Sequence, residues 1–360
     1  MRPSEITPEN LRGLPRKGYS GARIVLLVIT AYEALGCLAG GTMLVAQPDG
    51  SLMRMPVSIM HHAFESFFWP GALLFCLGLL NSFAFIAVLR KRSSAWFLSS
   101  MAMGGLAIWF WIEIAILLEL HWLHAMWGLP VLAGAVAAAA LLPGKVRVNV
   151  LLACGILSSL LYLAINIVVP MKWLEYDLNT QTISELSAIG APTRMLWIIL
   201  SAPYTLLVIA FAFGIMRSAG SNNRLRTVGK LVLVYGMLGL LWPAVPMHLR
   251  PTLAAGGGTI TDSLHLALGA VTDVLYLVTL TVAAGALGRA FRIYSFATFL
   301  LLLVFGILTF QQSPGIASGE PTPYIGLFER VNITLFLVWI IVLGLILMIN
   351  RSGRLKNEGG

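Results

Sequence analysis

Ten long apolar stretches run through the chain, and almost every Lys and Arg lies on one side of them. A helix needs about 20 apolar residues to cross a hydrocarbon core about 30 Å thick, and the stretches have about that length. They are continuously apolar, whereas barrel strands alternate, so a transmembrane barrel is excluded. The predicted spans are residues 24–46, 67–89, 96–118, 122–142, 148–169, 195–216, 228–247, 264–287, 293–310 and 331–349.

The composition requires lipid as the solvent for these helices. Hydrophobic residues make up 58% of the 360 residues and charged residues only 11%, whereas a soluble domain carries about 25% charged residues. We therefore predict an all-α, polytopic helical membrane protein with about ten transmembrane helices. Nucleic-acid binding is not expected, because no loop on the basic side is long enough to fold into a binding patch.

The basic residues predict the orientation of the helices. With a cytoplasmic N-terminus, the outer connections hold only five of the 24 basic residues: Arg54, Lys172, Arg194, Arg250 and Arg330. Because Lys and Arg accumulate in cytoplasmic loops, both the N-terminus and the C-terminus are predicted to be cytoplasmic. We expect a multi-pass protein of the plasma membrane, the inner membrane of a bacterium, whose basic loops contact anionic membrane lipids.

A basic turn at residues 143–147 divides the spans into four and six. The predicted organisation is a cytoplasmic tail at 1–22, a four-helix module at 23–145, a six-helix module at 146–350 and a second tail at 351–360. Long loops in compact proteins are usually functional or disordered. The long loops predicted here are all extracytoplasmic, at 47–66, 170–194, 248–263 and 311–330.

Three short segments carry a family resemblance in the six-helix module: 179–187 (NTQTISELS), 262–266 (DSLHL) and 326–331 (GLFERV). Through them, residues of about 148–350 resemble a bacterial membrane family known as domain of unknown function 998. The first four spans, about 20–145, resemble another uncharacterised four-helix bacterial membrane module through 47–50 (QPDG) and 69–71 (WPG). Neither resemblance implies an established activity.

Candidate chemical groups concentrate on the outer side, where all six His residues fall. Imidazoles and carboxylates are the usual acid–base groups and metal ligands. The candidate catalytic residues are Glu185, His248, Asp262 and His265. Loop composition alone also predicts polar residues here, because the basic residues are confined to the other side.

The eighth span carries a polar stripe. Asp262, His265, Asp273 and Tyr276 recur at intervals of three or four residues or their multiples, and therefore share one helical face. An ionisable group as deep as Asp273 marks a functional site by default, although a structural hydrogen-bond network would satisfy the same burial rule. The predicted cavity-lining residues are Tyr162, Asn166, Asp273, Tyr276, Glu329 and Arg330.

The same residues raise the question of a metal. His248, Asp262 and His265 are suitable Zn²⁺ ligands, and Asp262 and His265 lie three residues apart, with Glu185 as a general base. However, neither a His-x-x-x-His nor a His-Glu-x-x-His signature is present. We therefore expect no cofactor, with a metal at these three residues as the alternative.

The four-helix module carries two carboxylates inside its spans, Glu33 and Glu113. Glu33 shares a span with Gly36 and Gly40, a small-residue spacing that lets two helices approach closely. We expect Glu33 to be hydrogen-bonded across that contact. A proton or cation path using Glu33 and Glu113 is the alternative.

These observations favour one function and leave two others open. The favoured function is the binding or processing of a lipid-like or amphipathic small molecule at an extracytoplasmic polar cavity. The alternatives are a proton-coupled secondary transporter, although no inverted repeat is evident, and a scaffold subunit of a membrane complex. The sequence leaves open whether the protein is an enzyme and which protein partners it has.

Overall fold

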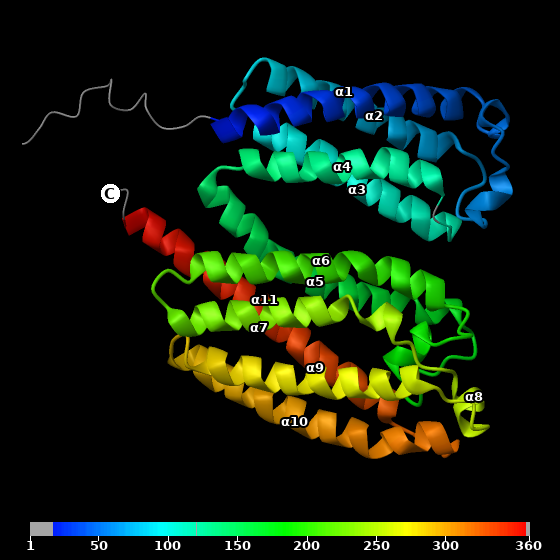
Figure 1. Cartoon of the computed structure of the whole chain (residues 1–360), viewed down its shortest axis with the longest axis vertical. Coiled ribbons are helices and arrows are strands. Elements are labelled where there is room, and N and C mark those ends of the chain that lie inside the picture. Colours follow the sequence, from blue (N-terminus) through cyan, green and yellow to red (C-terminus); the bar gives the residue numbers. More distant parts are fainter. Residues whose placement is uncertain (1–16, 120, 358–360) are drawn as a thin grey trace, which may run out of the picture. The chain divides into compact units, whose positions relative to one another are not determined.

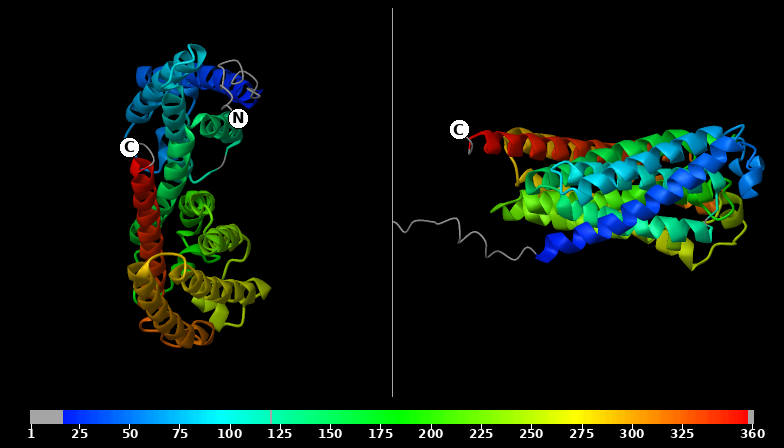
Figure 2. Two further views of the ribbon diagram at one scale, coloured as in Figure 1. Left: turned by 90° about the vertical axis from the view of Figure 1, so that its left-hand side faces the viewer. Right: turned by 90° about the horizontal axis from the view of Figure 1, so that it is seen from above.

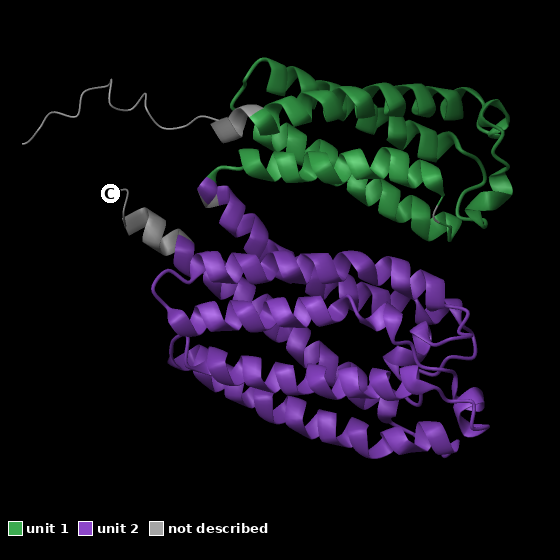
Figure 3. Cartoon of the chain, in the orientation of Figure 1, with its two compact units in different colours: residues 1–143 green, residues 144–360 purple. Residues whose placement is uncertain are grey.

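The computed structural model describes residues 17–357 except residue 120, and consists of helices joined by connections of different lengths (Figure 1). Ten helices in the described ranges are long and apolar enough to cross a membrane. No strand occurs among the described residues, only an isolated bridge between Ile189 and His248. The all-α, multi-pass membrane architecture is therefore confirmed. The chain divides into two compact units, Met1–Pro143 and Gly144–Gly360 (Figure 3).

Unit 1 is a closed four-helix bundle. Its helices are α1 (Lys17–Ala46), α2 (Phe68–Leu89), α3 (Ala95–Leu117) and α4 (Trp122–Leu141), with two short 3₁₀ helices, η2 (Ser51–Met53) and η3 (Val57–Met60), between α1 and α2. Each helix packs against the next, and α4 packs back against α1. Leu26, Met103, Leu106 and Val131 form part of its buried core.

Glycines bring α1 and α2 of unit 1 close together. A Cβ on Gly41 would lie 2.6 Å from the backbone nitrogen of Phe75, and one on Gly78 would lie 2.8 Å from that of Leu38. No real Cβ fits at such distances, so the two backbones can approach only because these residues are glycine. Helices in lipid associate through close van der Waals contact, because the hydrophobic effect does not drive them together there.

Unit 2 is a ring of six long helices. They are α5 (Gly144–Val168), α6 (Arg194–Ser218), α7 (Asn223–Gly239), α9 (Ile260–Ala284), α10 (Arg289–Ser318) and α11 (Ile325–Asn357). Each packs against its successor, and α11 returns to pack against α5; Figure 2 shows the same succession. Short helical turns occupy the connections: η4 (Pro170–Lys172), η5 (Ile183–Ser187), η6 (Trp242–Ala244) and α8 (Arg250–Ala254).

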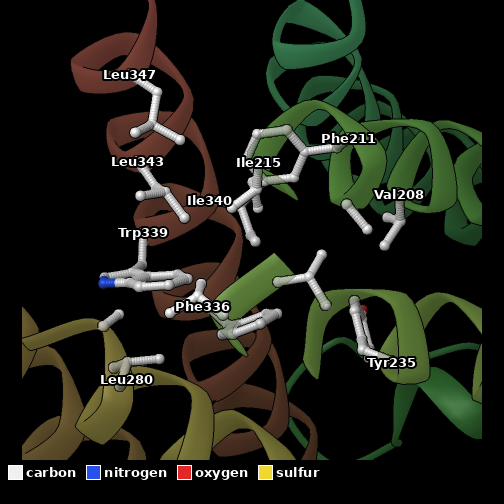
Figure 4. Close-up of a cluster of buried hydrophobic side chains, with 14 of the residues drawn as sticks. Val208, Phe211, Ile215, Tyr235, Leu280, Phe336, Trp339, Ile340, Leu343 and Leu347 are labelled. Carbon is white, nitrogen blue, oxygen red and sulfur yellow. The ribbon is translucent and has the colours of Figure 1, made fainter. Parts of the chain in front are cut away.

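Apolar side chains fill the ring of unit 2. Phe211 and Ile215 of α6 meet Trp339 and Leu343 of α11 and Leu280 of α9, all nearly or fully buried (Figure 4). The indole nitrogen of Trp339 donates to Ser295 Oγ of α10 at 3.1 Å, which satisfies its one polar atom.

Each unit has two different ends. We call the end with the long connections the loop end, which the charges predict to be extracytoplasmic, and the opposite end the basic end. In unit 1 the loop end carries residues 47–67. In unit 2 it carries 169–193, 240–259 and 319–324.

Helix boundaries in unit 2 differ from the predicted spans at the loop end. The predicted loop 311–330 is mostly helical, because α10 continues to Ser318 and α11 begins at Ile325. A helix satisfies its own backbone, so it need not end where the apolar run ends. Conversely, α7 ends at Gly239, well before the predicted residue 247, and Pro243 and Pro246 follow. Proline cannot donate the backbone hydrogen bonds that would continue the helix.

Candidate functional site

An ion pair between Glu185 and Arg250 lies at the loop end of unit 2. Glu185 is 0% exposed. The Arg250 guanidinium donates from Nε to Glu185 Oε1 at 2.6 Å and from Nη2 to Oε2 at 2.8 Å. Glu185 Oε2 also accepts from the backbone of Thr182 at 2.7 Å, as the third residue of a capping box that starts η5. Both carboxylate oxygens therefore accept hydrogen bonds, so Glu185 is not placed here as a free general base.

Arg250 joins three separate connections. Its Nη1 donates to Thr322 Oγ1 at 2.5 Å and its Nη2 to the carbonyl of Thr180 at 2.6 Å. Arg250 lies in α8, Thr180 in the loop before η5, and Thr322 between α10 and α11. Sequence reasoning missed this role. The sequence did hold one indication: basic residues are rare on the predicted outer side, so an Arg in this region is expected to have a specific partner.

The first turns of α11 hold the same loop through Glu329 and Arg330. Glu329 Oε2 accepts from the backbone of Ile183 at 2.5 Å. Arg330 Nη1 donates to the carbonyls of Leu178 and Gln181 at 2.8 and 3.0 Å. The two segments at 179–187 and 326–331 are thus partners in space. We call Glu185, Arg250, Thr322, Glu329 and Arg330 the loop-end network.

Arg330 also anchors the phenol of Tyr176. Its Nη2 donates to Tyr176 Oη at 2.5 Å, and Tyr176 in turn donates to the carbonyl of Thr182 at 2.6 Å. Burial raises the pKa of Tyr176 above its usual value, and the Arg330 guanidinium opposes part of that rise. Tyr176 therefore acts as a neutral donor in this loop.

His248 and Asp262 form a direct pair. The backbone nitrogen of His248 donates to Asp262 Oδ1 at 2.7 Å, and His248 Nδ1 lies 2.9 Å from Oδ2. Asp262 Oδ2 also accepts from the backbone of Thr259 at 2.8 Å, which caps the start of α9. The pair therefore fixes the segment after η6 to the first turn of α9.

His265 lies one turn further along α9, with a different partner. Its Nδ1 lies 2.8 Å from the carbonyl oxygen of Val245, and its ring meets Trp242 edge-on. Its Nε2 is buried with no hydrogen-bond partner among the described residues. Within that part of the chain, no three His, Cys, Asp or Glu side chains are placed to hold one metal ion. The ligand set His248, Asp262 and His265 is thus not assembled in this structure.

Asp273 lies against the neighbouring helix α10. A Cβ on Gly306 of α10 would lie 3.8 Å from Asp273 Oδ2 and 3.0 Å from Nδ2 of Asn332 on α11. No described residue donates a hydrogen bond to Asp273. The Asp273 side chain is partly exposed. Oδ1 of Asn332 and of Asn166 are buried without a partner in the described chain. Asp273 therefore faces α10 and α11, apart from Asp262 and His265.

Four tyrosines from four helices form a layer across the ring. The rings of Tyr162 (α5) and Tyr204 (α6) lie 4.7 Å apart, and the Tyr204 and Tyr235 (α7) hydroxyls are hydrogen-bonded. Tyr276 (α9) donates to Tyr235 Oη at 3.3 Å and stacks on Phe336 of α11. Of the predicted cavity-lining residues, Tyr162 and Tyr276 belong to this layer, whereas Glu329 and Arg330 belong to the loop-end network.

A surface pocket of about 430 Å³ opens at the loop end of unit 2. We call it the interface pocket; it is lined by Lys172, Trp173, Leu174, Glu175, Gly190, Pro192 and Leu249. Ile189 and His248, which precede two of these residues, pair through the backbone. Successive residues of extended chain point to opposite sides, so Leu249 lines the pocket while His248 turns to Asp262. The predicted catalytic residues do not line this pocket; His248 immediately precedes its residue Leu249, and Glu185 binds Arg250, which immediately follows Leu249.

Comparison with known protein families gives a match over most of unit 2. The family model described as "Protein of unknown function (DUF998)" matches residues 156–346, a range that includes all three resembling segments. No curated protein and no solved structure matches the chain. The resemblance of the six-helix module is confirmed, while that of the four-helix module stays a prediction. Because the match covers more than half of the chain, this multi-pass helical membrane protein belongs to the family of unknown function DUF998.

Proposed function

We propose that unit 2 binds a lipid-like or amphipathic small molecule at its loop end, taking it from the outer leaflet. The observation that carries the proposal is the interface pocket of about 430 Å³. Ligand pockets in proteins usually measure about 300–1,000 Å³ and combine apolar walls with a few placed polar groups. This pocket is open to the surface and places Lys172 and Glu175 beside Trp173, Leu174 and Leu249.

The rim of the pocket has the character of a membrane interface. Met171 and Leu174 are 74% and 102% exposed, and they flank Lys172 and Trp173 in the chain. Exposed apolar side chains beside Trp and Lys are typical of chain that dips into the head-group region. A molecule leaving the leaflet at this level would meet the pocket directly.

The charges of the pocket favour a polar head group on the ligand. Lys172 can bind a phosphate or carboxylate as a compact cation, and Glu175 can bind an amine. The rings and side chains of Trp173, Pro192 and Leu249 suit the apolar part that follows. We therefore expect a small amphipathic molecule with its head group held between Lys172 and Glu175.

Native mass spectrometry of the purified full chain tests the proposal. Wild-type protein and the double variant Lys172→Glu, Trp173→Ala are titrated with a short-chain anionic phospholipid. We expect the double variant to bind about tenfold more weakly, a loss of about 1.4 kcal/mol. Lys230→Glu is the matched control, because Lys230 is an exposed cation of α7 near the basic end. Equal titration curves for the double variant and the wild type would reject the interface pocket as the site.

A proton-coupled carrier is the second candidate, and Asp273 favours it. An ionised carboxylate with no hydrogen-bond donor is costly within a membrane, and carriers use such groups as proton sites. A panel of single substitutions scored by one cellular phenotype, at matched expression, separates the two functions. Loss confined to Asp273→Asn supports the carrier, whereas loss at Lys172 and Trp173 supports binding at the pocket. Tolerance at every position favours a scaffold without chemistry of its own.

The catalytic roles assigned to Glu185, His248, Asp262 and His265 stay predictions. In our proposal these residues hold the loops that form the pocket, so their replacement acts on ligand binding through loop position. Lower affinity together with lower thermal stability is the expected signature of each replacement. Unchanged stability with complete loss of an activity would instead assign them to chemistry.

A further inference from the structure

We infer that unit 1 contains a proton-transfer site at Glu33, which exchanges protons with the loop end through Glu113 and His124. The starting observation is that Glu33 is 0% exposed and that both of its carboxylate oxygens are buried without a hydrogen-bond partner in the described chain. The prediction that Glu33 is hydrogen-bonded across a close helix contact is therefore wrong. The site lies entirely within unit 1, so it does not rest on the function proposed above for unit 2.

Glu33 lies near the middle of its span. The membrane-crossing part of α1 is Gly21–Ala46, so Glu33 is about 13 residues, or about 20 Å, from the loop end. The contacts of Gly41 with Phe75 and of Gly78 with Leu38 set the antiparallel register of α1 and α2. In that register Asn81 of α2 and Glu33 of α1 lie at nearly the same depth, less than one helical turn apart along the helix axis. Asn81 Oδ1 is also buried without a partner, so a second polar atom at this depth is unsatisfied.

A line of ionisable groups leads from Glu33 toward the loop end. Cys37 lies one turn along α1 and is within electrostatic range of both Glu33 and Glu113. Glu113 Oε2 of α3 lies 3.9 Å from His124 Nε2 of α4. The Glu113 side chain is 35% exposed, whereas Glu33 is fully buried and the His124 side chain is 7% exposed, so Glu113 is the accessible group of the line.

The surroundings of Glu33 favour a neutral acid that can give up its proton. Tyr32 and Cys37 of α1 are the titratable groups beside Glu33, with Glu113 of α3 and His124 of α4 further toward the loop end, and no Lys or Arg of the described residues pairs with Glu33. A buried carboxylate without a partner costs several kcal/mol. Protonation removes that cost. The proton leaves the Glu33 carboxyl oxygen for a water molecule that enters from the loop end. That water passes a proton to the carboxylate of Glu113, which returns it to bulk water directly or through the imidazole of His124.

Infrared spectroscopy of the full chain in lipid nanodiscs tests the inference. A protonated carboxylic acid has its own carbonyl band, which shifts in D₂O once the proton exchanges. We expect a band that exchanges in wild type, disappears in Glu33→Gln and returns at a different frequency in Glu33→Asp. The Gln variant keeps the shape of the side chain, and the Asp variant restores a signal that a purely structural role does not require.

A second variant tests the route. Glu113→Gln should keep the Glu33 band but slow its exchange by about tenfold or more, because an acid–base relay is removed. Ser82→Ala on α2 is the control, since within the described chain Ser82 bonds only to the carbonyl of Gly78 in its own helix. A Glu33 band that does not exchange, that exchanges equally fast in Glu113→Gln, or that vanishes with added Na⁺ at constant pH would overturn the inference.

Discussion

Single charged residues at the loop end of unit 2 are held by partners far away in the chain. Arg250 meets Glu185 across 65 positions of sequence, and Glu329 meets the backbone of Ile183 across 146. The Glu185 carboxylate is completely buried. A buried ion pair contributes little net stability when intact, but removal of one partner leaves an uncompensated charge.

The Glu185–Arg250 pair gives a prediction at this scale. Arg250→Met should lower the free energy of unfolding by about 3–5 kcal/mol, because Glu185 stays buried without its cation. The double variant Arg250→Met, Glu185→Gln should lose less than the sum of the two single variants. Denaturant titration of the detergent-solubilised protein measures both. Lys230→Met, an exposed cation without an ion pair among the described residues, is the control, and equal stability of Arg250→Met and this control would contradict the prediction.

At the scale of elements, helix ends and loops form the functional region together. α11 begins at Ile325, and the backbone nitrogen of Gly326 donates to the carbonyl of Asn179 at 2.8 Å. A Cβ on Gly326 would lie 2.1 Å from the carbonyl oxygen of Gln181. The loop before η5 therefore rests directly on the backbone of α11, and only glycine permits this contact.

Gly326→Ala tests that contact. We expect a loss of about 1–3 kcal/mol, because the neighbouring atom belongs to backbone and cannot rotate away. Gly104→Ala is the matched control, since a Cβ on this helical glycine of α3 meets nothing within 4 Å. Alanine in a helix is favoured over glycine by about 0.5–1 kcal/mol, so the control should be neutral or stabilising. Equal melting temperatures for the two variants would refute close packing at Gly326.

At the scale of the whole molecule, the central prediction is the orientation in the membrane. Nineteen of the 24 basic residues lie at the predicted cytoplasmic side, and short loops rich in Lys and Arg remain in the cytoplasm. Single cysteines at positions 145 and 226 should then be protected from a membrane-impermeant thiol reagent in intact cells. Cysteines at 175 and 259 should be labelled.

The background for this labelling experiment is a chain without Cys37, Cys76 and Cys154, which are free thiols in the structure. Permeabilised cells provide the control, because all four positions should then react. Labelling at 226 in intact cells would reverse the orientation, and with it the assignment of the interface pocket to the outer leaflet.

Much of the architecture could be predicted from the sequence because lipid imposes one strong rule. A chain in hydrocarbon must satisfy its own backbone, so an apolar run of about 20 residues becomes a helix whatever its neighbours do. Each apolar run can be recognised from its own residues, and so can the family segments at 179–187 and 326–331. Helix ends were less predictable, as with α7 and α10, since backbone hydrogen bonds and proline set them, and hydropathy does not.

Only the tertiary structure decided which polar residues meet. The stripe on α9 was read as one face, yet Asp262 and His265 bind the segment after η6 while Asp273 faces α10 and α11. The spacing of polar residues shows on which side of one helix they lie. It does not show which residue of another helix they contact. For the same reason Arg250 and the interface pocket were missed, and Glu33 was expected to be bonded. What the sequence determined alone is the membrane architecture, because that depends on the solvent, whereas the site depends on contacts between distant segments.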